Sequence, residues 1–176
     1  MLFRSVSQSR YDMLNSLRWV FDRVFKKNKR RFDKIVGYEY VDLPERKTKN
    51  SAGYDIAAAK NVICKPREIT IIPTGLKAYM NDDEFLAVYI RSSVGIKKGL
   101  MMANSVGVID ADYADNTVND GHIHVALYNT LSTPITIPEG ECVAQGVFTK
   151  FGVTCDDDAY GERVGGFGST NRGHSG

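Results

Sequence analysis

Five short stretches of this sequence combine glycine with side chains that carry chemistry. They are "SAGYDIAA" (51–58), "RSSVGIKKG" (91–99), "NSVGVIDADY" (104–113), "GECVAQGVF" (140–148) and "GGFGST" (165–170). Guanidinium and small hydroxyl groups suit phosphate oxygens, and glycines let the backbone approach them closely. The carboxylates of Asp55, Asp110 and Asp112 suit a hard cation and its waters. Together these residue types predict a site for a magnesium-bound polyphosphate.

Two common nucleotide-binding signatures do not occur in the sequence. There is no "GxxxxGK[ST]" run, which would place a lysine and a hydroxyl on a phosphate-binding loop. There is also no "GxGxxG" run between a strand and a helix. The sequence therefore excludes a P-loop and a dinucleotide-binding fold.

The third stretch places a carboxylate near an aromatic ring. Apolar Val106, Val108 and Ile109 lead to Asp110, and Tyr113 follows in the same turn. A carboxylate on a tight turn can orient a water, and an adjacent ring can pack against a sugar. The alternative is a structural turn, in which the aspartate bonds only to its own backbone.

The C-terminal segment "GGFGSTNRGHSG" holds one aromatic ring among glycines and small polar residues. Such a composition buries too little apolar surface to order itself, which predicts a mobile tail over residues 163–176. Phe167 between glycine hinges fits a lid that closes over a bound ligand. A plain disordered terminus is the alternative.

Short β-rich runs, separated by Pro, Gly, Asn and Asp, dominate the chain from about residue 36. In "HIHVALYN", Ile123, Val125 and Leu127 fall on one face of a strand and the two histidines on the other. Only "SSVGIKKGL" has helical character. The pattern predicts an all-β sandwich or barrel over residues 35–162.

The first 34 residues differ from the rest in charge. Ten Lys/Arg against three Asp give residues 1–34 a net charge of +7, which leaves −5 for residues 35–176 because the whole chain carries +2. Apolar residues at helical spacing over 11–27 predict a basic, helical extension, either weakly folded or docked on a membrane or partner. Because it precedes the first expected barrel strand, we expect it to be dispensable for catalysis. The acidic body disfavours nucleic acid as a partner.

Three cysteines, Cys64, Cys142 and Cys155, lie far apart and in no metal-ligand spacing. They are expected to be buried or partly buried free thiols in a reducing, cytoplasmic compartment. No apolar run is long enough to cross a bilayer, and the N-terminus lacks the continuous apolar segment of a secretory signal.

The five stretches, in this order, resemble the five motifs of the trimeric dUTPase family over about residues 36–172. The turn "DYADNTVNDGHI" is similar to that of the Gram-positive and phage branch. The resemblance implies a jelly-roll-like β-barrel and a homotrimer with active sites at the subunit interfaces. It also implies hydrolysis of dUTP to dUMP and pyrophosphate with Mg²⁺, which limits uracil in DNA and supplies dUMP for dTMP synthesis.

The resemblance implies a role for each residue of the phosphate side of the site. Asp55 would hold magnesium through a water. Arg91, Ser92 and Ser93 would bind the phosphates, and Gln145 would contact the substrate from the fourth motif.

On the nucleoside side, Asn104 and the backbone of 104–109, Val108 included, would read the uracil edge. Asp110 would activate the attacking water. Tyr113 would pack on the deoxyribose and leave no room for a 2′-hydroxyl.

The resemblance also gives roles to the tail. Arg163 would reach the γ-phosphate. Arg172 is the alternative, because the usual fifth motif has two residues between the arginine and the paired glycines, whereas here only Val164 separates Arg163 from Gly165. Phe167 would lie over the uracil ring, and Gly168 and Ser169 would close on the nucleotide.

Two further departures from the family pattern stand out. Cys142 occupies a position that usually holds arginine, which would weaken a salt link at the trimer axis or a barrel end. The loop after Tyr113 is about six residues longer than usual and fits a surface lid or partner contact. Its Asp115, Asp120 and His122 are either a second metal site or part of a solvated turn.

Other functions remain as alternatives. A related dCTP deaminase would need a glutamate in the third motif, and none lies between Asn104 and Tyr128. A regulatory, nucleotide-sensing protein would use the same pocket, with or without catalysis.

Overall fold

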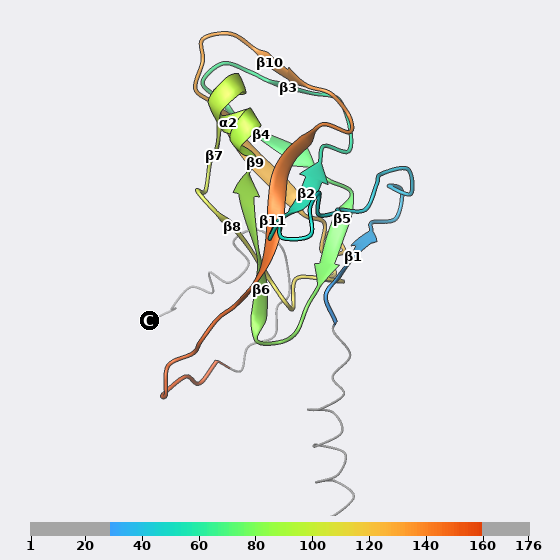
Figure 1. Ribbon diagram of the computed structural model, residues 1–176, viewed down its shortest axis with the longest axis vertical. Coiled ribbons are helices and arrows are strands. Elements are labelled where there is room, and N and C mark those ends of the chain that lie inside the picture. The colour runs from blue at the N-terminus through green and yellow to red at the C-terminus, as the bar shows by residue number, and fades with distance from the viewer. Residues whose placement is uncertain (1–28, 160–176) are drawn as a thin grey trace, which may run out of the picture.

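The computed structural model describes residues 29–159, so the predictions for the N-terminal helix and the C-terminal lid lie outside the described residues (Figure 1). The elements are β1 Arg31–Lys34, β2 Tyr54–Ala57, β3 Val62–Cys64, β4 Ile69–Pro73, β5 Leu76–Tyr79, β6 Glu84–Ile90, α2 Ser92–Lys98, β7 Leu100–Met102, β8 Gly107–Asp110, β9 His124–Asn129, β10 Ile135–Ile137 and β11 Cys142–Lys150. The predicted all-β class is confirmed, and α2 coincides with "SSVGIKKGL", the stretch of helical character predicted within the β-rich part of the chain.

The strands within residues 29–159 form four antiparallel sheets. The largest has the order β2-β11-β6-β8, a second has the order β4-β9-β7, and the pairs β1-β5 and β10-β3 complete the set. The described strands therefore do not close into the single barrel that was predicted. One cause is visible at Gly75, whose φ of +70° ends β4 and turns the chain into β5, which pairs in another sheet.

One apolar core joins these sheets. Leu86 and Val88 of β6 are buried together with Ile72 of β4 and Val125 and Leu127 of β9. Buried residues alternate with less buried ones along β5 and β9, as in a half-buried sheet, whereas the middle of β6 is buried on both faces. The predicted inner face of "HIHVALYN" is confirmed, because its three aliphatic side chains are fully buried.

Strand β1 corrects the predicted domain boundary. β1 pairs with β5, and Phe32 is buried against the rings of Tyr54 and Phe148 at centroid distances of 5.5 and 5.4 Å. Arg30 donates from Nε to Glu84 at 2.9 Å. The expectation that residues 1–34 all precede the barrel is therefore wrong for residues 30–34. The dense positive charge of this segment concealed its single core residue from sequence reasoning.

The helix α2 follows directly on β6 and lies at its far end (Figure 1). Arg91 occupies the N-cap position with extended backbone and makes no side-chain capping bond, so its guanidinium is left for other partners. Gly99 ends the helix in the left-handed conformation at φ +65°. The junction of β6 and α2 thus presents Arg91 and Ser92 at one edge of the largest sheet.

The three thiols are free, but they differ in exposure. Cys64 is buried, Cys142 is half-buried and Cys155 is exposed, so the expectation of burial is wrong for Cys155. Burial raises the pKa of the Cys64 thiol. Within residues 29–159, no helix has the length and apolar character to cross a membrane.

Candidate active site

Four of the predicted site residues come together where β2, β11 and β6 lie side by side. Gln145 of β11 is opposite Asp55 of β2 on one side and Tyr89 of β6 on the other, and Arg91 follows at the end of β6. Asp55, Arg91, Ser92 and Gln145 line one cavity of about 200 Å³. Residues from three separate motifs therefore converge because antiparallel pairing places the strands that carry them next to one another.

The carboxylate of Asp55 lies at the centre of this group. Arg91 Nε lies 3.3 Å from Asp55 Oδ1, and the Asp55 side chain is only 13% exposed. Asp55 Oδ2 is buried and has no hydrogen-bond partner within the described residues. A buried carboxylate oxygen without a donor is costly, and a water or cation would satisfy it. This donor chemistry fits the water-mediated magnesium site predicted for Asp55.

The close approach of the Gln145 side chain explains why a glycine, Gly53, lies two residues before Asp55. A Cβ placed on Gly53 would lie 2.4 Å from Gln145 Oε1 and 3.1 Å from Gln145 Cβ. Gly53 therefore allows the Gln145 amide to lie directly against the backbone before Asp55.

Sequence reasoning missed two residues of the cavity. Lys47 and Ser51 also line it, and Lys47 forms an ion pair with Glu45. Lys47 is one of several charged residues in "ERKTKN", so nothing in the sequence distinguished it from a solvated loop. It adds a second cation beside Arg91, which favours a polyanionic ligand.

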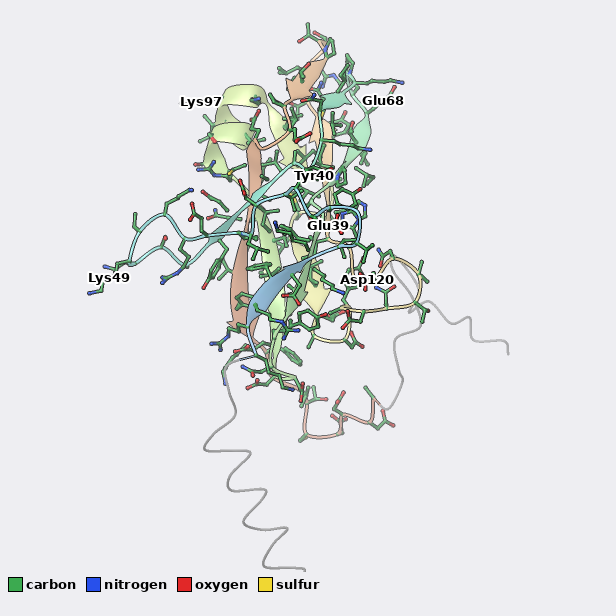
Figure 2. The ribbon with its side chains drawn as sticks, turned by 90° about the vertical axis from the view of Figure 1, so that its right-hand side faces the viewer. Glu39, Tyr40, Lys49, Glu68, Lys97 and Asp120 are labelled. Carbon is green, nitrogen blue, oxygen red and sulfur yellow. The ribbon has the colours of Figure 1, made fainter. Side chains whose placement is uncertain are left out.

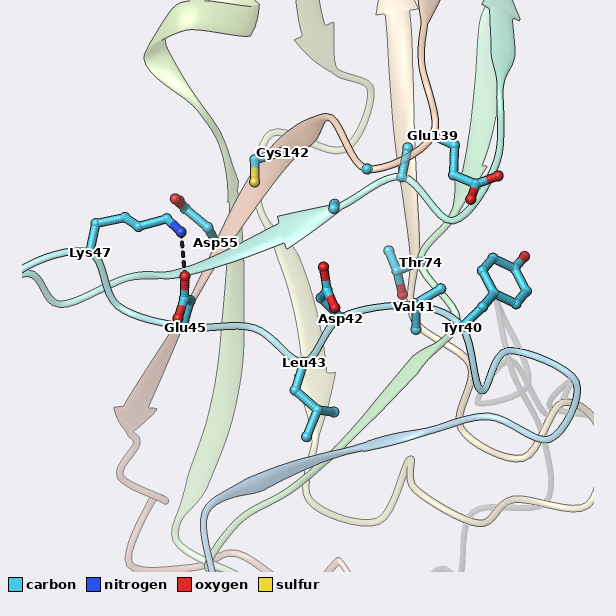
Figure 3. A pocket seen from close by; sticks show the side chains of 13 residues that line it. Tyr40, Val41, Asp42, Leu43, Glu45, Lys47, Asp55, Thr74, Glu139 and Cys142 are labelled. Atoms are coloured by element: carbon cyan, nitrogen blue, oxygen red, sulfur yellow. Dashed lines mark hydrogen bonds and ion pairs between the residues drawn. The ribbon is translucent and has the colours of Figure 1, made fainter.

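A larger cavity of about 580 Å³ adjoins the first and shares Asp55 and Lys47 with it (Figure 3). Figure 3 shows Asp55, Lys47 and Cys142 gathered at one end, while Tyr40 and Glu139 lie at the other. Burial, and then the nearby Asp55, raises the pKa of the Cys142 thiol. The thiol is therefore protonated at neutral pH and adds no charge to this wall.

Asp110 lies far from this group in the same chain. It pairs with Phe85 near the start of β6, whereas Arg91 follows the end of β6. Six residues of extended chain at about 3.3 Å each separate the two positions by roughly 20 Å. Asp110 and Asp112 instead line a cavity of about 450 Å³ with Glu84 and Phe151. A single chain therefore does not bring its predicted base to its predicted phosphate site.

The three carboxylates suited to a cation are divided in the same way: Asp55 lines one cavity, and Asp110 and Asp112 line the other. No group of three His, Cys, Asp or Glu side chains close enough to hold a metal occurs between residues 29 and 159. Within one chain Asp55 and Asp110 therefore do not share a site, because they lie beside opposite ends of β6.

The third motif forms the predicted tight turns at both ends of β8. Ser105 has a φ of +62°, and the amide of Val106 donates to the carbonyl of Asn104 at 2.7 Å. Val108 is 57% exposed, so β8 presents an open apolar edge. After β8, the Tyr113 amide donates to the Asp110 carbonyl at 3.1 Å. Asn104, Asp110 and Tyr113 thus lie on one short segment.

The remaining predicted residues lie elsewhere. Ser93 is exposed on α2 and does not line the cavity of Asp55. Arg163, Phe167, Gly168, Ser169 and Arg172 lie outside the described residues.

The loop after Tyr113 does not form a metal site. Its Asp115 and Asp120 accept hydrogen bonds from Lys77 Nζ at 2.5 and 2.8 Å. The Nε2 of His122 is buried and accepts the Gly75 amide at 2.9 Å. Lys77 Nζ lies between the two carboxylates, where a metal ion would have to bind. The alternative of a second metal site in this loop is therefore wrong.

His122 gives a testable pH dependence. Its burial, and then the neighbouring His124, lower the pKa of the imidazole from 6.5 to about 4. The folded protein therefore binds fewer protons than the unfolded chain between these values, and stability is lost as the pH falls from 6.5 towards 4. This group alone should cost on the order of 3 kcal/mol at about pH 4, from 1.36 kcal/mol per pKa unit. Urea unfolding at about pH 7 and about pH 4.5 measures the loss.

His122→Gln is the control for this prediction. A glutamine retains an acceptor for the Gly75 amide but does not titrate. The variant should lose less stability than the parent over the same pH range, since His124 and the carboxylates are common to both. Equal losses in the two proteins would contradict the prediction.

Comparison with known proteins adds independent evidence. The family model for dUTPase matches residues 39–176. The deoxyuridine 5′-triphosphate nucleotidohydrolase of Lactococcus lactis is 48% identical over 145 residues, covering 80% of this chain and 97% of that protein.

Solved structures agree with this match. The crystal structure of dUTPase from Streptococcus mutans has a TM-score of 0.68 and 42% identity, covering 71% of this chain and 98% of that chain. A point mutant of the dUTPase from phage phi11 of S. aureus, whose structure shows the coordination of a structural Mg(II) ion, has a TM-score of 0.63 at 21% identity. It covers 76% of this chain and 98% of that chain.

Proposed function

This chain belongs to the dUTPase family and hydrolyses dUTP, and from that premise we propose that each active site is built from two copies of the chain. In this arrangement Asp110 of one copy faces Arg91 of another. The observation that carries the proposal is the separation of these residues along β6. Closed rotational symmetry would bring the two ends of neighbouring copies together, and a homotrimer gives three such sites.

The phosphate half of the site consists of the cations and donors around Asp55. Arg91 and Lys47 neutralise the triphosphate, and the hydroxyl of Ser92 donates to it. When the triphosphate binds, its oxygens replace Asp55 as the partner of the Arg91 guanidinium. The orphaned Oδ2 of Asp55 would hold Mg²⁺ through a water. The ion would supply positive charge that stabilises the phosphoryl oxygens.

The nucleoside half consists of the third motif of the other copy. Asp110 accepts a proton from a water whose oxygen attacks the α-phosphorus. The bond from this phosphorus to the bridging oxygen of the β-phosphate breaks, which releases dUMP and pyrophosphate. The turn at Asn104 and Ser105 presents backbone groups to the uracil edge, and the ring of Tyr113 lies against the deoxyribose. A mismatched base would cover those groups without pairing them, which is the source of base selectivity.

Mixing two inactive variants tests the shared site. Asp110→Asn and Arg91→Ala should each be inactive alone as homotrimers. After refolding together from denaturant, roughly a quarter of the interfaces should pair an intact Asp110 with an intact Arg91, by random assortment. Pyrophosphate release from dUTP should therefore return to roughly that fraction of parental activity.

The control is a mixture of Asp110→Asn with Asp110→Ala, in which no site has an intact base. It should recover nothing. If mixed trimers of Asp110→Asn and Arg91→Ala form and stay inactive, both residues act within one chain and the proposal is wrong.

A further inference from the structure

We infer that the loop 114–121 is a brace that fixes the Tyr113 ring and thereby sets the preference for deoxyribose over ribose. The inference rests on the proposed contact between Tyr113 and the sugar. It assigns a positioning role to loop residues that lie outside the five motifs.

The loop bonds to Tyr113 both at its backbone carbonyl and at its ring hydroxyl. Asn116 Nδ2 donates to the Tyr113 carbonyl at 2.8 Å, and Asn119 Nδ2 donates to the Tyr113 hydroxyl at 2.9 Å. The same hydroxyl donates to the His122 carbonyl at 3.2 Å. Tyr113 is only 7% exposed, so its ring has little freedom to move away from a ligand.

The two asparagines are themselves held in one orientation. Asn116 Nδ2 also donates to Asn119 Oδ1 at 2.7 Å, and Asn116 Oδ1 accepts the amides of Val118 and Asn119 at 3.0 and 3.1 Å. Asn116 is buried. These bonds fix which end of each amide faces Tyr113, so both asparagines present donors to it.

The loop is anchored to the body of the protein by β5 (Figure 2 shows Asp120 on the loop). Lys77 of β5 bonds to both Asp115 and Asp120, and the Tyr79 hydroxyl donates to Asp115 at 2.8 Å. Burial opposes the charge of Lys77, but these hydrogen bonds outweigh it and raise the pKa of the lysine. The lysine therefore stays charged over the whole physiological range.

The backbone of the loop passes through the left-handed region at three described residues. Asp115 and Asp120 have φ values of +60° and +56°, which aspartate adopts more readily than most residues other than glycine. Gly121 has a φ of +78°, and a Cβ there would lie 2.7 Å from the Ala114 Cα, so this position requires glycine. The Lys77 ion pairs tie the side chains of both aspartates to β5.

A rigid ring is what sugar selection requires. An added 2′-hydroxyl is rejected only weakly by a pocket whose wall can yield, and strongly by one that cannot. A variant in which the loop holds Tyr113 less firmly should therefore accept UTP. Its selectivity for the base should not change, because the separate turn at 104–109 recognises the base.

The test compares two selectivities in the same variant. Asn119→Ala should lower the ratio of kcat/KM for dUTP over UTP by about tenfold or more, mainly through faster UTP turnover. The ratio of dUTP over dTTP, which reports on the base, should stay within about twofold. Asp120→Asn removes one anchoring charge without leaving a cavity, and it should lower the sugar ratio in the same direction by a smaller factor.

The matched control is Asn61→Ala. Asn61 Oδ1 accepts the Glu139 amide at 2.9 Å, so this variant loses an asparagine bond of the same kind from another loop. Both ratios should stay at their parental values in it. The parent's own preference for dUTP tests the proposed function separately. An unchanged sugar ratio in folded Asn119→Ala and Asp120→Asn, or an equal fall in the base ratio, overturns the brace.

Discussion

Replacing Asp110 with asparagine is expected to lower kcat for dUTP by about a hundredfold or more, the usual effect of losing a positioned base. Asparagine has nearly the same shape but cannot accept the proton of the attacking water. The pairing of residue 110 with Phe85 involves the backbone and should persist, so the fold and KM should change little. Steady-state release of pyrophosphate, together with the unfolding midpoint, gives both quantities.

Asp82→Asn is the matched control for this prediction. Asp82 lines the same cavity and its side chain is 76% exposed, so the variant removes one negative charge from the cavity without touching the proposed base. Its kcat should stay within about threefold of the parent. Parental turnover by Asp110→Asn, or an equal fall in Asp82→Asn, would show that Asp110 is not the base.

The second large effect is expected from shortening the N-terminus. A chain that starts at Lys29 should retain the stability and turnover of the parent, whereas one that starts at Ile35 should lose about 5 kcal/mol of unfolding free energy. Removing Phe32 exposes core surface worth about 1.5–3 kcal/mol. Removing Arg30, whose side chain is 37% exposed, leaves the buried carboxylate of Glu84 with only its bonds from Asn81, at about 1.5–3 kcal/mol for a lost hydrogen bond to a charged group.

Point substitutions separate the contribution of single side chains in β1 from the effect of shortening the chain. Phe32→Ala in the full chain should reproduce part of the loss, and Arg31→Ala, whose side chain is 54% exposed, should reproduce little of it. The urea unfolding midpoints of the two shortened chains and the two substituted chains measure these losses of stability. If the chain that starts at Ile35 is as stable as the one that starts at Lys29, β1 adds nothing to the fold.

Most of the polar residues that line the cavity of Asp55 could be picked out from the sequence, but their arrangement in space could not. Asp55, Arg91 and Gln145 are short polar interruptions of apolar strands, which a reader of the sequence can find. Their convergence depends on β2, β11 and β6 being neighbours, and that pairing joins segments about ninety residues apart with no local signal. The separation of Asp110 from Arg91 also depends on strand register, which composition does not reveal.

The loop after Tyr113 shows a different limit of sequence reasoning. Its Asp and Asn residues have the composition of a solvated turn, and that reading describes most such segments correctly. Here Lys77, on a strand far away in the sequence, pairs with two of the acids, and Asn116 is buried. Only the fold places that lysine beside the loop.

The position of the two half-sites at opposite ends of β6 also bears on how such a chain can change length during evolution. Leu86 and Val88 face the core, so inserting or deleting one residue in β6 would turn every later side chain to the opposite face. The spacing of Asp110 and Arg91 is therefore tied to a segment that tolerates no gradual lengthening. Insertions are tolerated only outside β6. The longer loop of residues 114–121 is such an insertion, and it leaves the spacing of Asp110 and Arg91 unchanged.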